Sequence, residues 1–163
     1  MSKVASPAVQ VDEDVDLAPT LNAALDGHNI TLGLHFVQAT RNEVVAEIVV
    51  GAHHHQAYGI VHGGVYTSMI ETTCSVGGAM QAAQHGANAV GLENQTSFLH
   101  AVRAGTLRVT ARPIELGRRT QLWQANVVER ARPDRIVASG RVRMYVIEQG
   151  GALAGEALGV KAR

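Results

Sequence analysis

The spacing of apolar residues divides the chain into an early pair of strands, one long helix and a late run of strands. Residues 18–27 are predicted to form a short helix that ends at Gly27. Residues 30–40 and 42–50 resemble two strands joined by a turn at residues 41–42. The pattern changes from alternating to helical at about residue 64.

Residues 64–84 are predicted to form the long helix, because their apolar side chains recur three or four positions apart. Apolar residues cover two neighbouring faces of it: Val65, Met69, Val76, Met80 and Ala83 on one, and Tyr66, Ile70 and Cys74 on the other. So wide an apolar surface predicts a helix that other structure encloses. The narrow polar stripe carries a single carboxylate, Glu71, between Thr67 and Ser75. Burial of an unpaired carboxylate is strongly unfavourable, so Glu71 requires an explanation.

The second half of the chain has a period of two, which is typical of strands with one solvated face. Four such stretches follow one another: residues 89–99, 105–116, 119–130 and 135–148. Turn-forming residues separate the last three, in "ELGRR" and "ARPDR". One long helix packed against one curved antiparallel sheet, an α+β fold, is the simplest arrangement of these elements.

The 163 residues suffice for one domain, which we place at residues 18–148, between a flexible arm at 1–17 and a flexible tail at 149–163. The formal net charge is zero, which argues against nucleic acid or an anionic membrane surface as a partner. The single cysteine, Cys74, excludes an internal disulfide and suits a reduced compartment. Without an apolar leader or a run of about 18 apolar residues, the chain is expected to be cytoplasmic.

Two stretches carry a resemblance to a known family: "QAYGIVHGGVYTSMIETTCS" at residues 56–75 and "LENQTSFLHAVRAGTLRVTAR" at residues 92–112. Over residues 28–147 the chain resembles the hotdog-fold acyl-CoA thioesterases of the phenylacetate-pathway type, a branch that includes 4-hydroxybenzoyl-CoA thioesterases. The resemblance implies a hotdog fold, in which a curved antiparallel sheet wraps one long central helix.

The chain departs from many members of that branch at two places. They carry Asp and Asn where this chain has Glu71 and Gln56, which is the pairing of the 4-hydroxybenzoyl-CoA type. Many relatives also have Pro where this chain has His100 or Ala101. The second departure leaves the fold intact and bears on the substrate pocket.

Thioester hydrolysis requires a group that stabilises the carbonyl oxygen as it gains negative charge. Backbone N–H groups at a helix N-terminus do this well, because they lack partners in the helix and lie at its positive end. We therefore predict that the amides of Gly63 and Gly64 bind this oxygen and that Gln56 donates to it or orients it. The alternative is a tight turn that simply requires glycine. His62 is expected to fix the loop by hydrogen bonding rather than act as a base.

Glu71 is predicted to act either as a nucleophile, which would give a mixed anhydride, or as a general base on water. Ser75, one turn further on, is predicted to hold that water or to orient the carboxylate. The resemblance implies the same catalytic roles for both. Two structural alternatives stay open: an ion pair between Glu71 and an arginine, and a bond from Ser75 to the carbonyl four residues earlier.

The distance along the helix predicts a site built from two chains. At 1.5 Å per residue, Glu71 lies about 10 Å from Gly64, and its side chain spans only part of that gap. We therefore expect one chain to supply the loop and helix start and a second chain to supply Glu71 and Ser75. The resemblance also implies a homodimer with sites at its interface, and it implies that two dimers often form a homotetramer.

Coenzyme A is expected only as part of the substrate, with no separate cofactor. Loop cations and polar strand residues are its predicted contacts: Arg103, Arg118, Arg119 and Thr120 for the phosphates, and Asn94 and Ser97 for the acyl group. Ordinary solvated hairpin charge would explain the cations equally well. The run His53-His54-His55 does not predict a metal site, because neighbours on an extended loop point apart and no Cys, Asp or Glu lies nearby.

The sequence thus predicts an acyl-CoA thioesterase for aromatic or medium-length acyl groups, and two other classes stay open. A hotdog hydratase or dehydratase for 3-hydroxyacyl or enoyl thioesters needs a catalytic His paired with an acid, for which "LHFVQ" at residues 34–38 is the one faint match. A non-catalytic acyl-CoA-binding regulator would carry a DNA-binding helix pair, and the first 28 residues are too short and too acidic for one.

Overall fold

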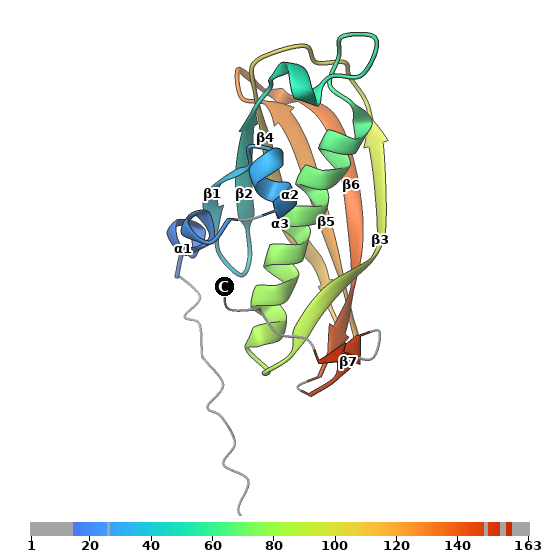
Figure 1. Cartoon of the computed structure of the whole chain (residues 1–163). Helices are drawn as coiled ribbons and strands as arrows, with labels where there is room; N and C mark the ends of the chain where they lie inside the picture. The colour runs from blue at the N-terminus through green and yellow to red at the C-terminus, as the bar shows by residue number, and fades with distance from the viewer. Residues whose placement is uncertain (1–14, 26, 149, 154–155, 158–163) are drawn as a thin grey trace, which may run out of the picture.

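The computed structural model describes residues 15–25, 27–148, 150–153 and 156–157 of the chain. Figure 1 shows one long helix lying across one face of a curved sheet. The elements follow in the order α1 (Ala18–Ala23), α2 (Gly27–Thr31), β1 (His35–Ala39), β2 (Val44–Val49), the 3₁₀ turn η1 (Ala52–His54), α3 (Gly63–Ala83), β3 (Asn88–Phe98), β4 (Thr106–Leu116), β5 (Thr120–Glu129), β6 (Arg132–Ile147), β7 (Ala152–Leu153) and β8 (Glu156–Ala157).

The long helix α3 runs from Gly63 to Ala83, so the helix predicted over residues 64–84 is confirmed. Its packing explains one of the two glycines in its interior. Gly77 lies against the indole ring of Trp123, where any Cβ would overlap the ring. Glycine weakens a helix by about 1 kcal/mol relative to alanine. Here it lets the helix backbone approach the sheet closely.

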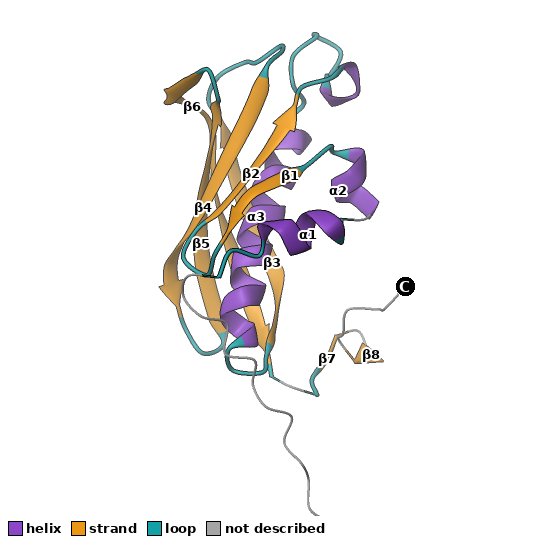
Figure 2. Cartoon of the chain, turned by 90° about the vertical axis from the view of Figure 1, so that its left-hand side faces the viewer, coloured by secondary structure: helices purple, strands orange, loops and turns teal. Residues whose placement is uncertain are grey.

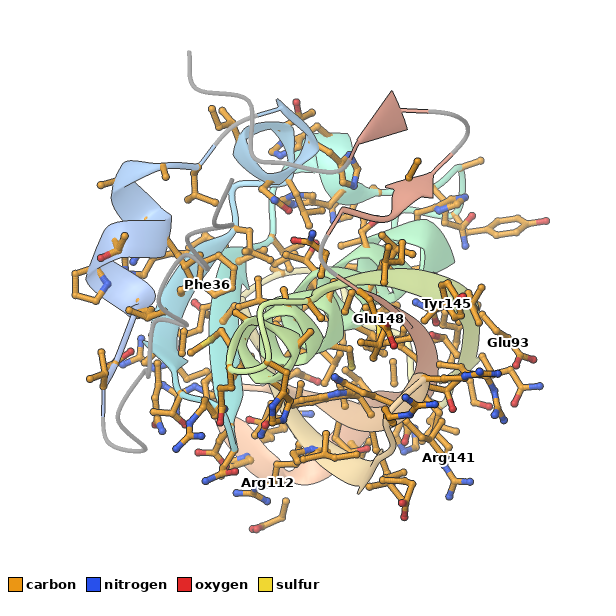
Figure 3. All side chains as sticks on the ribbon, turned by 90° about the horizontal axis from the view of Figure 1, so that it is seen from below. Phe36, Glu93, Arg112, Arg141, Tyr145 and Glu148 are labelled. Atoms are coloured by element: carbon orange, nitrogen blue, oxygen red, sulfur yellow. The ribbon has the colours of Figure 1, made fainter. Side chains whose placement is uncertain are left out.

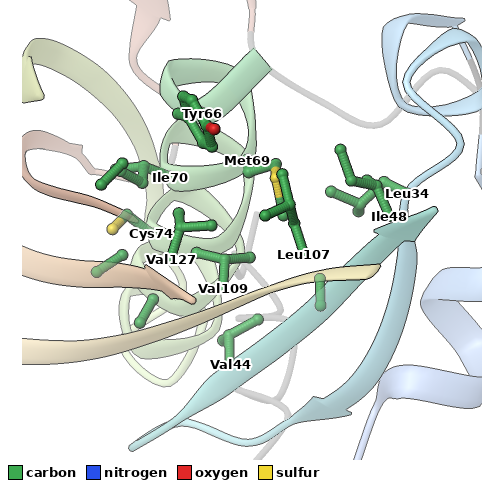
Figure 4. Packing of buried hydrophobic residues seen from close by; sticks show 14 of the residues in the cluster. Leu34, Val44, Ile48, Tyr66, Met69, Ile70, Cys74, Leu107, Val109 and Val127 are labelled. Atoms are coloured by element: carbon green, nitrogen blue, oxygen red, sulfur yellow. The ribbon is translucent and has the colours of Figure 1, made fainter. Parts of the chain in front are cut away.

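Six strands form one antiparallel sheet in the order β1-β2-β4-β5-β6-β3, which confirms the predicted α+β hotdog arrangement. In β4 the predicted alternation holds, since Leu107, Val109 and Ala111 are buried and the residues between them are only partly buried. These side chains pack with Met69 and Ile70 of α3 in one hydrophobic core (Figure 4). Strands β1 and β3 form the two edges of the sheet.

The outer face of the sheet, away from α3, is polar and charged. Arg108 pairs there with Glu47 at 2.7 Å, and Arg112 pairs with Glu43. Figure 3 shows Arg112 and Arg141 on this outer side, with the long helix, seen nearly end-on, on the other side of the strands. The alternating pattern of the strands therefore separates a dry inner face from a solvated outer one.

The strand predicted over residues 30–40 is wrong at its start, because residues 27–31 form helix α2. Gly33 has a φ of 63° and closes α2 in a Schellman motif. In it the N–H groups of Gly33 and Leu34 donate to carbonyls of the last turn at 2.9 and 3.0 Å. The alternating residues just before Gly33 therefore belong to a short helix that is terminated by this glycine.

Two other boundaries differ from the prediction. α1 ends at Ala23 rather than at Gly27, and β6 begins at Arg132, inside the turn predicted at residues 131–135. Figure 2 shows α1 and α2 on the β1 side of the molecule. The predicted arm and tail lie largely outside the described residues. Within the described part, no helix combines the length and the apolar character needed to cross a membrane.

Candidate active site

The half-buried carboxylate of Glu71 is held between the middle of α3 and the edge strand β3. Its Oε2 accepts a hydrogen bond from Asn94 Nδ2 at 2.8 Å, and its Oε1 accepts one from Ser75 Oγ at 3.2 Å. Among the described residues Glu71 forms no ion pair, so the alternative of an arginine partner finds no support there. Ser75 bonds the Glu71 carboxylate rather than the backbone carbonyl four residues earlier. Each carboxylate oxygen therefore has one donor and keeps a free lone pair.

Asn94 is held in one orientation by its own neighbours. Thr96 Oγ1 donates to Asn94 Oδ1 at 2.7 Å, so the amide nitrogen is the group that faces Glu71. The same nitrogen lies 3.3 Å from the carbonyl oxygen of Thr67, one turn before Glu71. Asn94 was predicted to contact the acyl group. The structure places it in contact with the Glu71 carboxylate.

Gly91 provides the space that the Glu71 carboxylate occupies beside β3. A Cβ at this position would come within 3.0 Å of Glu71 Oε1, closer than real Cβ atoms come to a neighbour. The pairing of β3 with β6 shifts register between Gly91 and Glu93, which leaves Leu92 as an extra, exposed residue. Bulges of this kind are frequent next to active sites, where they redirect a strand.

The N-terminus of α3 offers one free amide rather than two. His62 is the N-cap, and its Nδ1 accepts a hydrogen bond from Gly64 N–H at 2.9 Å. Among the described residues no acceptor is recorded for Gly63 N–H. The ring of Phe98 lies directly over Gly63, at a place where any side chain would overlap it. Gly63 is therefore the residue that can donate to a ligand.

Gln56 and Gly63 line the same cavity, of about 260 Å³. Gln56 Oε1 accepts a hydrogen bond from Tyr58 N–H at 3.1 Å, which leaves the amide nitrogen as a donor. The other lining residues are mostly apolar or aromatic: Ile60, Val61, Tyr66, Phe98, Leu99, His100 and Ala101. Glu71 does not line this cavity. Within one chain, the predicted donors Gly63 and Gln56 therefore lie at a cavity that the Glu71 carboxylate does not line.

The residues predicted to bind coenzyme A lie in two separate regions, one at the hairpin beside the end of α3 and one in the loop before β4. Arg118 lines a cavity of about 720 Å³ beside the C-terminal end of α3, where it lies 3.9 Å from Glu148. Arg119 and Thr120 follow it, exposed, in the same hairpin. Arg103 is exposed in the loop before β4, and its backbone oxygen lies 2.7 Å from His55 Nε2.

Ser97, predicted to lie near the acyl group, is exposed near the end of β3. His35, of the faint hydratase match, lies on β1, the opposite edge of the sheet from Asn94. The described residues include no group of three or more His, Cys, Asp or Glu that could hold a metal ion.

Sequence reasoning missed Gly91 and Thr96. A lone glycine inside a strand pattern signals a bulge or a close approach, so Gly91 carried a usable signal. Thr96 carried none.

Comparisons with known proteins identify the family of this chain. Residues 58–143, more than half of the chain, match the family model described as the Thioesterase superfamily. A Mycobacterium tuberculosis protein named "Putative esterase" is 36% identical over 72% of this chain and 84% of its own length. The "Proofreading thioesterase EntH" of Klebsiella pneumoniae is 31% identical over 67% of this chain and 80% of its own. The crystal structure of a Haemophilus influenzae thioesterase superposes with a TM-score of 0.76 at 26% identity, covering 83% of this chain and 94% of that one. The chain belongs to the thioesterase superfamily, with the hotdog fold.

Proposed function

We propose that the chain hydrolyses acyl-CoA thioesters, with Glu71 as nucleophile or general base. The observation that carries this proposal is the carboxylate itself, which is half-buried and has one hydrogen bond on each oxygen. A partly buried carboxylate with a purely structural role would be expected to pair with a cation. Here the partners are neutral donors, and each carboxylate oxygen keeps a lone pair for reaction.

The proposed reaction follows from these groups. The thioester oxygen accepts hydrogen bonds from Gly63 N–H and Gln56 Nε2, which stabilise the negative charge that develops on it. Either a Glu71 oxygen attacks the carbonyl carbon, or water attacks while Glu71 takes its proton. The carbon–sulfur bond then breaks, and the coenzyme A thiolate leaves and is protonated. In the nucleophilic route, water hydrolyses the anhydride and restores Glu71.

A second copy of the chain would bring the two halves together. Strand β3 forms an edge of the sheet and exposes the large apolar side chains of Leu92 and Phe98. Such an edge can accept another strand. We propose a homodimer in which Glu71 of one protomer faces the Gly63 cavity of its partner, and the resemblance extends this to a dimer of dimers. The separation of Glu71 from that cavity within one chain supports this proposal.

The acyl group is proposed to be aromatic, as in the 4-hydroxybenzoyl-CoA type. The cavity at Gly63 has Tyr66 and Phe98 in its wall, with their ring centroids 6.0 Å apart. A relative in Listeria monocytogenes, 29% identical over 61% of this chain and 80% of its own, is named 1,4-dihydroxy-2-naphthoyl-CoA hydrolase. The phosphates of coenzyme A are proposed to contact Arg118 at the cavity beside the end of α3.

Thiol release from a panel of benzoyl-, 4-hydroxybenzoyl-, hexanoyl- and octanoyl-CoA tests this function. Glu71→Ala and Glu71→Gln are expected to lower kcat/KM by about 10³-fold, within the usual range for loss of a general base or nucleophile. The control is Glu93→Gln, which changes an exposed acid of β3, the strand beside Glu71, and should keep activity. Equal hydrolysis by wild type and Glu71→Ala would refute the site. Hydration of an enoyl-CoA without thiol release would identify a hydratase instead, and tight binding without turnover would identify a regulator.

A further inference from the structure

His54 is the buried member of the His53-His54-His55 run, and its exposed fraction is 3%. Its ring bridges two segments that lie far apart in the sequence. Nδ1 accepts a hydrogen bond from Gly51 N–H at 2.9 Å, and Nε2 lies 3.1 Å from the carbonyl oxygen of Leu32, just after α2. The ring therefore anchors η1 to the end of α2.

The backbone of His54 also holds the start of α3. Its carbonyl oxygen accepts the N–H of His62 at 2.8 Å, and His62 is the N-cap directly before Gly63. The next pair along this loop, His55 and Val61, forms an isolated antiparallel bridge. The position of the Gly63 amide is therefore tied to His54 through His62 and one hydrogen bond.

These contacts require a neutral ring. Nδ1 acts as an acceptor, and Nε2 must carry the proton because it faces a carbonyl oxygen. A second proton would have to go on Nδ1, where it would face the Gly51 N–H. Burial lowers the pKa of His54, and the positive charges that His53 and His55 acquire in acid act in the same direction. Because the folded state disfavours the charged ring, stability falls as pH drops below the unfolded value of about 6.5.

The hydrogen bond to the Leu32 carbonyl favours the charged ring, but its effect on the pKa of His54 is smaller than that of burial. His54 lines a cavity of about 390 Å³ whose other titratable residues are all histidines: His53 and His55 from the same loop, His28 from α2 and His62 from the start of α3. The rings of His53 and His54 lie 3.9 Å apart. No carboxylate is among the described residues that line this cavity. Acidification therefore adds only charge of the same sign around His54.

We infer that His54 is a positioning residue, whose neutral ring holds the His62–Gly63 segment in the geometry that binds the thioester oxygen, and whose protonation releases it. This inference rests on the proposed thioesterase function. It differs from a role in packing alone, because it couples the rate of hydrolysis to the protonation of one buried ring. A packing role would depend on the size of the side chain and would not change the pH profile.

The test is kcat and KM for the preferred acyl-CoA between pH 5 and 8, with wild type, His54→Ala, His54→Gln and Glu71→Gln. The matched control is His53→Gln, which changes the exposed neighbouring ring. His54→Ala is expected to lower kcat about 10- to 100-fold at pH 7.5, with KM changed less than about 2-fold, since misplacing a catalytic group costs up to about 100-fold. His54→Gln offers an amide donor and acceptor that do not titrate. It should recover most of kcat and lose the decline that the wild type shows between pH 7 and 5.5.

Three results would overturn the inference: a kcat for His54→Ala within about 2-fold of wild type, an unchanged acid decline in His54→Gln, or the same loss in His53→Gln. If His54→Ala does not fold, the pH profile of His54→Gln decides alone. Glu71→Gln separates this inference from the proposed function. Full activity of Glu71→Gln would refute the function, whereas an inactive Glu71→Gln beside normal His54 variants would refute only the role of His54.

Discussion

Replacement of Gly91 with alanine is expected to remove most of the activity without unfolding the protein. A Cβ at this position of β3 would lie within 3.0 Å of Glu71 Oε1, which no real Cβ tolerates. That oxygen is the end of a flexible side chain, whereas the strand is held by its pairing with β6. The carboxylate, rather than the strand, will therefore move.

The size of the effect follows from this contact. The Cβ would lie far inside ordinary van der Waals separation, which begins at 3.4 Å, so Oε1 must retreat by about 1 Å. A misplacement of this size lowers a rate by about 100-fold. The same movement stretches the 2.8 Å bond from Asn94 and the 3.2 Å bond from Ser75. Alanine also favours a strand over glycine by about 0.5–1 kcal/mol. We expect kcat/KM to fall about 100-fold and the free energy of unfolding to change by less than about 1 kcal/mol.

Two measurements check this prediction for Gly91→Ala: thiol release from the preferred acyl-CoA, and urea unfolding followed by the fluorescence of the single, fully buried Trp123. Gln95→Ala is the control, because it truncates an exposed side chain of the same strand. Glu71→Asp supplies a second test, since its shorter side chain withdraws the carboxylate from the new methyl group. The loss caused by Glu71→Asp should be smaller in the Gly91→Ala background than in wild type. Full activity of Gly91→Ala, or destabilisation by several kcal/mol, would refute the reasoning.

Two further predictions concern buried groups of α3. Among the described residues Tyr66 Oη has no hydrogen-bond partner, so Tyr66→Phe should raise the free energy of unfolding by about 1 kcal/mol in urea titrations; a loss of similar size would reveal a hidden partner. Burial, with a smaller contribution from the charge of Glu71, raises the pKa of the Cys74 thiol. A thiol-reactive dye at pH 8 should therefore label the native protein far more slowly than the protein in urea, and equal rates would show that the helix opens readily.

The long helix and the late strands could be predicted because their patterns repeat over many residues. In α3 the apolar residues return every three or four positions, and in β4 they alternate from Leu107 to Ala111. The first strand was predicted to begin too early, at residue 30 rather than His35, because its pattern is short. Residues 30–34 alternate like a strand, yet the positive φ of Gly33 ends a helix there. The left-handed conformation of Gly33 decided the local structure, although five residues alternate like a strand.

Side-chain contacts in the site could be predicted between residues of one helix. They could not be predicted where they depend on the register and packing of strand β3. Glu71 and Ser75 share a helix face, so their contact follows from a spacing of four. The bond from Asn94 could not be derived, because it depends on how β3 lies against α3. The bulge at Leu92 shifts the register of β3 against β6 and is not visible as a pattern. Asn94 was predicted to lie near the acyl group, and its contact with Glu71 could not be derived from the sequence.

The departures from ordinary folding rules gather at two places, and this argues for a functional origin. Glu71 is an acid on an apolar helix, Gly91 interrupts the edge strand β3, and the bulge at Leu92 follows it. All three features lie around the Glu71 carboxylate. A buried histidine and a helix that begins with two glycines lie together at the Gly63 amide. Each of these features weakens local structure or adds a buried polar group, and none improves the packing of the core. If they served stability alone, alanine at Gly91 would destabilise the protein and leave the activity of the folded molecule intact, and His54 would be replaceable by any side chain of similar size. The variants of these two residues therefore test, at the middle and at the start of α3, whether the irregularities belong to one reaction.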